Sequence, residues 1–172
     1  QLKAVCRMLL EKYGQPVLVE TYLSGREFTV GIAGTGEQAR CLGVIEIILN
    51  DNAEEGVYSY VNKEECEERI FYSQTDQAAW DTCADLGLKV WQALHCEDGG
   101  RVDIRFDGSG KAYFLEVNPL AGMHPEHSDL PILASLHGIS YRRLIGMIMD
   151  SAIQKAGKNV YEEGAAVDQC SI

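Results

Sequence analysis

The sequence lacks both an excess of basic residues and a long apolar run. Lys and Arg number 15 against 26 Asp and Glu, which gives a formal net charge of −11. Nucleic acids and anionic membrane surfaces are bound through Lys and Arg that neutralise phosphates, so neither partner is expected. The longest apolar stretch, around residues 42–49, is interrupted by Glu46 and is shorter than the roughly 20 residues that span a bilayer.

Paired cysteine motifs are missing as well. No two cysteines are spaced as Cys-x-x-Cys, which argues against a zinc knuckle. Cys83 lies on an apolar helical stripe, and we expect it to be a small buried hydrophobe. Scattered thiols fit a reducing compartment, because disulfides persist mainly in oxidising ones. The sequence therefore predicts a cytoplasmic protein.

The beginning of the chain is not a typical N-terminus. It starts with Gln1 rather than Met and shows no signal-peptide pattern. From Leu2 to Tyr13, apolar residues already recur at helical spacing, so this segment predicts a helix. We expect the chain to be a piece of a longer polypeptide.

The composition supports a folded domain with a sizeable core. Hydrophobic residues make up 46% of the 172 positions. Apolar and β-branched runs predict strands at 17–20, 27–33, 39–49 and 58–62. Helical spacing predicts further helices at 76–95, at 130–136 and from residue 140 onward.

The order of these elements predicts the fold class. Hairpins adjoin one another early and helices are inserted later, which favours an α+β fold with a mainly antiparallel sheet and helices packed on one face. Residues 1–156 are predicted to form the folded part. From Gly157 the sequence turns polar, and residues 157–172 are predicted to be a flexible tail.

The most informative segment, residues 101–118, predicts two strands joined by a tight turn. Side chains alternate between the faces of a strand, so Arg101 and Asp103 share one face, and Glu116 and Asn118 share a face of the return strand. Where these faces coincide, two carboxylates and an amide oxygen meet. Such a set suits a hard cation such as Mg²⁺, which offsets the carboxylate repulsion and usually comes with phosphates. The alternative is the solvated polar face of an ordinary amphipathic hairpin.

Three ordered motifs between about Val17 and Ser151 resemble the D-alanine–D-alanine ligase family of the ATP-grasp superfamily. They are Glu20-Thr21-Tyr22-Leu23-Ser24-Gly25-Arg26-Glu27-Phe28-Thr29-Val30, then Gly100-Arg101-Val102-Asp103, and finally Leu115-Glu116-Val117-Asn118-Pro119 with Gly122-Met123, His127-Ser128 and Leu130-Pro131. The resemblance implies the C-terminal part of an ATP-grasp fold. It also implies an ATP-dependent ligase that phosphorylates a carboxylate and lets an amine attack the acyl phosphate.

The resemblance implies roles for the residues that hold metal and stabilise charge. Asp103 would bind one Mg²⁺, Glu116 would bridge two Mg²⁺ ions, and Asn118 would complete the site; Mn²⁺ is an alternative ion. Arg101 and the backbone N–H of Gly122 would stabilise the oxyanion of the tetrahedral intermediate.

The resemblance also implies nucleotide and substrate contacts. Ser128 would bind the carboxylate of the second amino acid. The segment from Glu20 to Leu23 would hold adenine, and Glu27 would hold the ribose hydroxyls. Lys63 is the nearest match to a family lysine on a loop over the active site. Glu64 follows it where many relatives have tyrosine, which leaves another amino acid or a peptide-like carboxylate as an alternative substrate.

Several of these residues have simpler alternative interpretations. Glu20 could end a strand as an exposed carboxylate, Glu27 could be solvated after a turn, and Arg101 could form a surface salt bridge. Ser128 could cap the helix that begins near Pro131. We assign no chemistry to the histidines of this loop.

The resemblance further implies what lies outside the chain. The family's N-terminal substrate domain and first ATP-grasp subdomain, which supply phosphate-binding lysines and the first amino-acid site, are expected in the same polypeptide. The partners are then small amino-acid substrates, and a homodimer stays open. A nucleotide-binding or structural module without catalysis is the remaining alternative.

Overall fold

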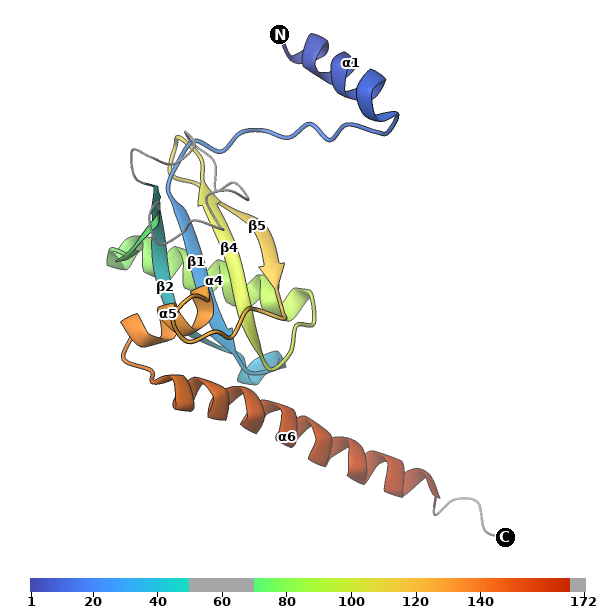
Figure 1. Cartoon of the computed structure of the whole chain (residues 1–172). Helices are drawn as coiled ribbons and strands as arrows, with labels where there is room; N and C mark the ends of the chain where they lie inside the picture. Colours follow the sequence, from blue (N-terminus) through green and yellow to red (C-terminus); the bar gives the residue numbers. More distant parts are fainter. Residues whose placement is uncertain (50–69, 168–172) are drawn as a thin grey trace.

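The computed structural model describes residues 1–49 and 70–167. Its elements are α1 (Leu2–Tyr13), β1 (Glu27–Ala33), the short 3-10 helix η1 (Gly36–Gln38), β2 (Arg40–Leu49), β3 (Ile70–Gln74), α4 (Gln77–Ala93), β4 (Gly99–Phe106), β5 (Ala112–Asn118), α5 (Asp129–Leu136) and α6 (Tyr141–Val167). Within these residues the strands form one five-stranded antiparallel sheet in the order β3-β2-β1-β4-β5 (Figure 1). The predicted α+β class with a mainly antiparallel sheet is confirmed.

The central strand β1 is buried along nearly its whole length. Every residue from Phe28 to Ala33 is buried, and only Glu27 at its start is partly exposed. A strand covered on both faces reads as a continuous apolar run rather than an alternation, and β1 has this pattern. The burial therefore requires a layer of side chains on each side of the sheet.

The helix α4 covers one face. Cys83 and Trp91 of α4 are fully buried against Phe28, Val30 and Ile32 of β1. The Asp76 carboxylate caps this helix by accepting a 3.0 Å hydrogen bond from the backbone N–H of Ala79.

The helix α5 covers the opposite face. Leu133 is fully buried there, in a cluster with Ile45, Ile47 and Ala33. It lies so close to β1 that a Cβ built on Gly31 would be 2.6 Å from the Leu133 Cδ2 atom. The prediction that the helices pack on one face is therefore wrong. Successive strand residues point to opposite faces, both faces of the sheet carry apolar residues, and each face is buried by a helix.

Two strand predictions also differ from the structure. Residues 17–20 form no strand in the described part of the chain, and Leu18 is 80% exposed. A strand needs a neighbour to pair with, and this segment pairs with none among the described strands. The strand β3 was not predicted, while the predicted strand at 58–62 lies outside the described residues.

Both ends of the described chain project from the sheet (Figure 1). The helix α1 stands apart from it, joined by an extended segment. The helix α6 continues through Gly157 to Val167, so the change in composition at Gly157 does not end the helix. Its middle is tied to the residue before β4 by hydrogen bonds from Ser151 and Lys155 to Asp98. The division into a folded part and a tail at residue 157 stays a prediction.

The buried position predicted for Cys83 is confirmed. Burial raises the pKa of its thiol to about 12, so the thiol stays protonated. Desolvation likewise raises the pKa of Cys41 to about 11. Among residues 1–49 and 70–167, no helix combines the length and apolar character that crossing a membrane requires.

The contact between α5 and Gly31 predicts a large stability effect at Leu133. Replacing Leu133 with Ala removes a fully buried side chain, and we expect it to lower the free energy of unfolding by about 2–5 kcal/mol. The matched control Leu120→Ala, at a position that is 95% exposed, should change it by less than about 0.5 kcal/mol. Chemical denaturation followed by Trp fluorescence measures both. Equal effects would show that α5 does not anchor on the sheet.

Candidate functional site

The face of the sheet that α5 covers carries a row of polar side chains on β1, β4 and β5. Antiparallel partners point to the same face, and the register pairs Thr29 with Asp103, Asp103 with Glu116, and Arg101 with Asn118. We call this set the polar face; its members are Glu27, Thr29, Arg101, Asp103, Arg105, Glu116 and Asn118. The predicted meeting of Arg101 and Asp103 with Glu116 and Asn118 is confirmed.

A β-bulge in the hairpin sets this register. The pairing shifts between Asp103 and Ile104, so Ile104 pairs with Phe114 while Asp103 pairs with Glu116. Leu115 is the extra residue on β5. If the pairing of Ile104 with Phe114 continued without a bulge, Asp103 would pair with Leu115, and Glu116 would point to the opposite face of the sheet. The bulge is therefore what brings the two carboxylates together.

The Asp103 carboxylate is held in place by its neighbours. It is 6% exposed, and its Oδ1 accepts a 2.9 Å hydrogen bond from the Thr29 hydroxyl. Its Oδ2 lies 3.4 Å from the Asn118 Nδ2 and 3.4 Å from the Arg101 Nε. A buried carboxylate needs such partners, because its desolvation is otherwise costly.

The side chain of Asn118 lies between two carboxylates. Its Nδ2 is 3.4 Å from Asp103 Oδ2 and 3.3 Å from Glu116 Oε1, where it donates to both. Amide nitrogen and oxygen exchange places by a half-turn, which would point Oδ1 at the same spot. Two carboxylates and one amide oxygen then surround a position suited to a hard cation.

Two carboxylates and one amide oxygen are too few ligands to hold a metal ion without further ligands from outside the protein. Within the described ranges, no group of three or more His, Cys, Asp or Glu side chains could hold a metal ion. Mg²⁺ is usually held by one or two carboxylates, with its remaining ligands supplied by water and substrate phosphates. The residues present therefore fit Mg²⁺ bound together with a phosphate ligand, while their metal role stays a prediction.

Arg101 lies between two acidic residues. Its Nη1 forms an ion pair with Asp129 Oδ2, and its side chain is 14% exposed. The other oxygen of Asp129 accepts a 2.6 Å hydrogen bond from the Tyr72 hydroxyl on β3. Arg101 therefore forms salt bridges, as the alternative interpretation expected, but they are largely covered rather than at the surface; its role toward the oxyanion stays a prediction.

Glu27 is also paired rather than solvated. Its Oε2 accepts a 3.0 Å hydrogen bond from Arg105 Nη1, and both side chains are largely buried. The guanidinium of Arg105 lies 5.4 Å from the centre of the Tyr22 ring. The alternative of a solvated Glu27 is wrong; its contact with ribose stays a prediction.

The loop after β5 brings Gly122 and Ser128 together. A Cβ on Gly122 would be 2.7 Å from Ser128 Oγ, so a larger residue there would have to displace the Ser128 side chain. The Ser128 hydroxyl accepts a 3.0 Å hydrogen bond from the His124 N–H, and in the described part of the chain it makes no capping bond to α5. Ser128 is the N-cap residue of α5 by position, as the alternative expected, but its side chain does not provide the cap; its contact with a substrate stays a prediction. The Tyr141 hydroxyl donates to the Met123 carbonyl at 2.9 Å, which ties the loop to α6.

Other predicted site residues are not brought to the polar face. Glu20 is exposed on the extended segment before β1, and Leu23 on the same segment is half-buried. Lys63 lies outside the described residues. The nucleotide roles of all three stay predictions.

Three residues around Asp103 and Arg101 were not predicted from the sequence. Thr29 could have been found from the period of β1, since it is polar at an alternate position of an otherwise apolar strand. No pattern in the sequence around Asp129 or Tyr72 indicated a contact with the site. They contact the site only because α5 and β3 come together over the sheet.

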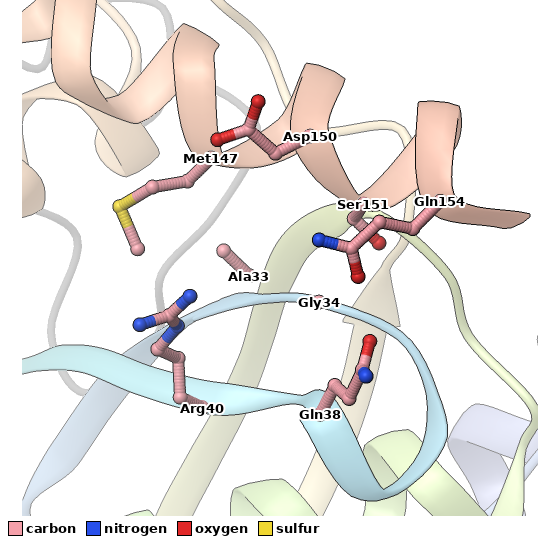
Figure 2. Close-up of a pocket in the computed structure, with 8 residues that line it drawn as sticks. All are labelled: Ala33, Gly34, Gln38, Arg40, Met147, Asp150, Ser151 and Gln154. Atoms are coloured by element: carbon pink, nitrogen blue, oxygen red, sulfur yellow. The ribbon is translucent and has the colours of Figure 1, made fainter.

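A separate small pocket lies between α6 and the end of the β1–β2 hairpin (Figure 2). Arg40 and Gln38 line it from the hairpin side, and Asp150 and Gln154 line it from α6. None of the predicted site residues lines it, so it is distinct from the polar face.

A five-stranded antiparallel sheet covered by helices on both faces, with a polar face at its final hairpin, defines the C-terminal part of an ATP-grasp fold. Residues 1–150 match the family described as "D-ala D-ala ligase C-terminus", and the chain belongs to that family. The D-alanine–D-alanine ligase of Bordetella petrii is 36% identical over 146 residues, which cover 84% of this chain and 43% of that protein. The chain thus spans less than half the length of the curated relatives it matches.

Two solved structures share the fold. One is the D-alanine–D-alanine ligase of Bacillus anthracis complexed with ATP, with a TM-score of 0.66, 22% identity, and coverage of 92% of this chain and 49% of that one. The other is the VanG D-Ala:D-Ser ligase of Enterococcus faecalis, with a TM-score of 0.62, 21% identity, and coverage of 87% and 42%. At these identities the likeness concerns the fold alone.

The turn that joins β4 and β5 is closed by Asp107. Its Oδ1 accepts hydrogen bonds from the Ser109 hydroxyl at 2.7 Å, the Ser109 N–H at 2.8 Å and the Lys111 N–H at 3.0 Å. These bonds to the charged form lower the pKa of Asp107 to about 2, with the Ser109 hydroxyl as the largest cause. Because the folded-state pKa is depressed, this stabilisation is present above the ordinary carboxyl pKa and is lost as the pH falls through about 2.

This turn predicts a pKa change on substitution of Ser109. In Ser109→Ala the pKa of Asp107 should rise toward the ordinary carboxyl value, because the strongest hydrogen bond to the charged form is gone. Ser109→Thr keeps the hydroxyl and should leave the pKa low. Carboxyl ¹³C chemical shifts recorded against pH measure it. An unchanged pKa in Ser109→Ala would contradict the assigned cause.

Proposed function

We propose that the chain is the C-terminal ATP-grasp part of an ATP-dependent carboxylate–amine ligase, and that the complete ligase joins D-alanine to D-alanine for peptidoglycan precursor synthesis. The observation that carries the proposal is the register that pairs Asp103 with Glu116 and Arg101 with Asn118 on one face. Membership of the family and the likeness to the Bordetella petrii ligase support it, as does the ATP complexed with the Bacillus anthracis ligase.

Asp103, Glu116 and the Asn118 amide oxygen would form the proposed cation site, which would hold two Mg²⁺ ions or, as a substitute, Mn²⁺. When bound, the ions supply neutralisation of the ATP phosphates and polarisation of the transferred phosphoryl group. Thr29 fixes the Asp103 carboxylate in advance, so little reorganisation is needed on binding. The nucleotide would extend toward Glu27, which holds the ribose hydroxyls.

The remaining nucleotide contacts in the proposal come from residues that are not on the polar face. The segment from Glu20 to Leu23 would hold adenine, and Lys63 would contribute to nucleotide binding from its loop. Further domains of the same polypeptide would supply the opposite wall of the ATP cleft and the first amino-acid site. We place the reaction in the cytoplasm, where thiols such as Cys83 stay reduced.

The proposed reaction has two steps. A carboxylate oxygen of the first amino acid attacks the γ-phosphorus of ATP, and ADP leaves. The amine of the second amino acid then attacks the acyl phosphate, and inorganic phosphate leaves. Arg101 and the Gly122 N–H would stabilise the oxyanion that develops in this second step.

Ser128 is suited to hold the second amino acid. Its oxygen already accepts from the His124 N–H, which fixes the hydroxyl and leaves its own proton to donate. A substrate carboxylate is the acceptor we propose for that proton. Because Gly122 lies against Ser128, the oxyanion donor and the carboxylate donor are neighbours.

The proposal predicts that the paired carboxylates are needed for turnover. In the complete ligase, Asp103→Asn and Glu116→Gln should each lower kcat for D-alanine-dependent phosphate release from ATP on the order of 100-fold. Asp81→Asn, an exposed acidic position on α4 at the other face of the sheet, should retain full activity.

The outcomes separate the parts of the proposal. Unchanged phosphate release in the Asp103→Asn, Glu116→Gln double variant would refute the metal assignment. Release with D-serine or another amino acid but not with D-alanine would keep the ligase class and replace the substrate. No amino-acid-dependent release from any substrate would favour a module without catalysis.

A further inference from the structure

We propose that Asp129 is a positioning residue that holds the Arg101 guanidinium away from the Asp103 carboxylate and so keeps Asp103 available to a divalent cation. This inference rests on the cation site proposed above. It concerns a residue one position after Ser128 that contacts Asp103 only through Arg101.

Arg101 has two acidic neighbours but does not engage them equally. Its Nη1 pairs with Asp129 Oδ2. Its Nε lies 3.4 Å from Asp103 Oδ2, yet this buried nitrogen has no hydrogen-bond partner among the described residues. The Nη1 of Arg101 is therefore engaged by Asp129, while its Nε faces Asp103 at ion-pair distance without forming a hydrogen bond.

The Asp129 carboxylate is fixed from two sides. It is the first residue of α5, and Leu130 and Leu133 anchor that helix against Gly31 of β1. Its Oδ1 accepts the 2.6 Å hydrogen bond from the Tyr72 hydroxyl on β3, and its side chain is mostly buried. A carboxylate held at both oxygens offers the guanidinium one defined position.

The charges on the polar face point to the same role. Glu27 and Arg105 neutralise each other, and Asp129 neutralises Arg101. Asp103 and Glu116 are the two carboxylates that face each other across β4 and β5, and a divalent cation would offset the repulsion between them. If Asp129 were neutral, Arg101 would turn to Asp103, its nearest remaining carboxylate, and compete with the cation.

The test measures Mn²⁺ affinity of the 172-residue chain by paramagnetic broadening of the amide signals of β4 and β5, which detects weak binding without turnover. Asp129→Asn should weaken Mn²⁺ binding about fivefold or more, as expected for coupled neighbouring charges. Tyr72→Phe, which changes no charge, should weaken it in the same direction by a smaller factor. In an Arg101→Gln background, Asp129→Asn should have no more than about a twofold effect.

The Mn²⁺ affinities of these variants test the role of Asp129 and the cation site separately. Equal effects of Asp129→Asn with and without Arg101 would mean that Asp129 acts through its charge alone, which overturns the inference. Unchanged Mn²⁺ binding in both Asp129→Asn and Tyr72→Phe would overturn it as well. Asp103→Asn serves as the control for the site: if the unchanged chain bound no Mn²⁺, or if Asp103→Asn bound it equally well, the cation site itself would fall and the inference with it.

Discussion

The carboxylates of Asp103 and Glu116 stand opposite each other on neighbouring strands, and like charges at that position repel. The Asp103 carboxylate is also buried, which makes its charge costly without partners. The Thr29 hydroxyl and the Asn118 amide offset part of this cost. In the proposed function, a cation that binds together with a nucleotide offsets the repulsion that remains.

The backbone supplies this arrangement through three features. The bulge at Leu115 turns Glu116 to the face of Asp103. The helix α4 holds the other face of β1 and β4 rigid, with Trp91 and Cys83 fully buried against it. The helix α5 packs on β1 and β2 beside the polar face, and its first residue, Asp129, reaches Arg101. Catalytic and binding geometry is best kept on such elements, since helices and strands position side chains more sharply than loops.

Local periodicity was enough to predict the hairpin, the faces of Arg101 and Asp103, and the helix that Asp76 caps. These features depend on alternation along one strand or on the first turn of one helix. The errors arose where tertiary partners decide. Residues 17–20 have strand composition but no described strand to pair with, and the second helix layer depends on how closely α5 approaches Gly31. The contacts of Asp129 with Arg101 and Tyr72 join three separate elements, so no local pattern indicated them.

The proposed cation site formed by Asp103, Glu116 and the Asn118 oxygen underlies both the proposed reaction and the role of Asp129. Anomalous diffraction from crystals of the chain soaked with Mn²⁺ and ATP can locate such an ion. We expect an anomalous peak between the two carboxylates, with the Asn118 amide turned so that its oxygen faces the ion. Mn²⁺ peaks elsewhere in the crystal, with none between Asp103 and Glu116 and the amide nitrogen still donating to both, would contradict the site.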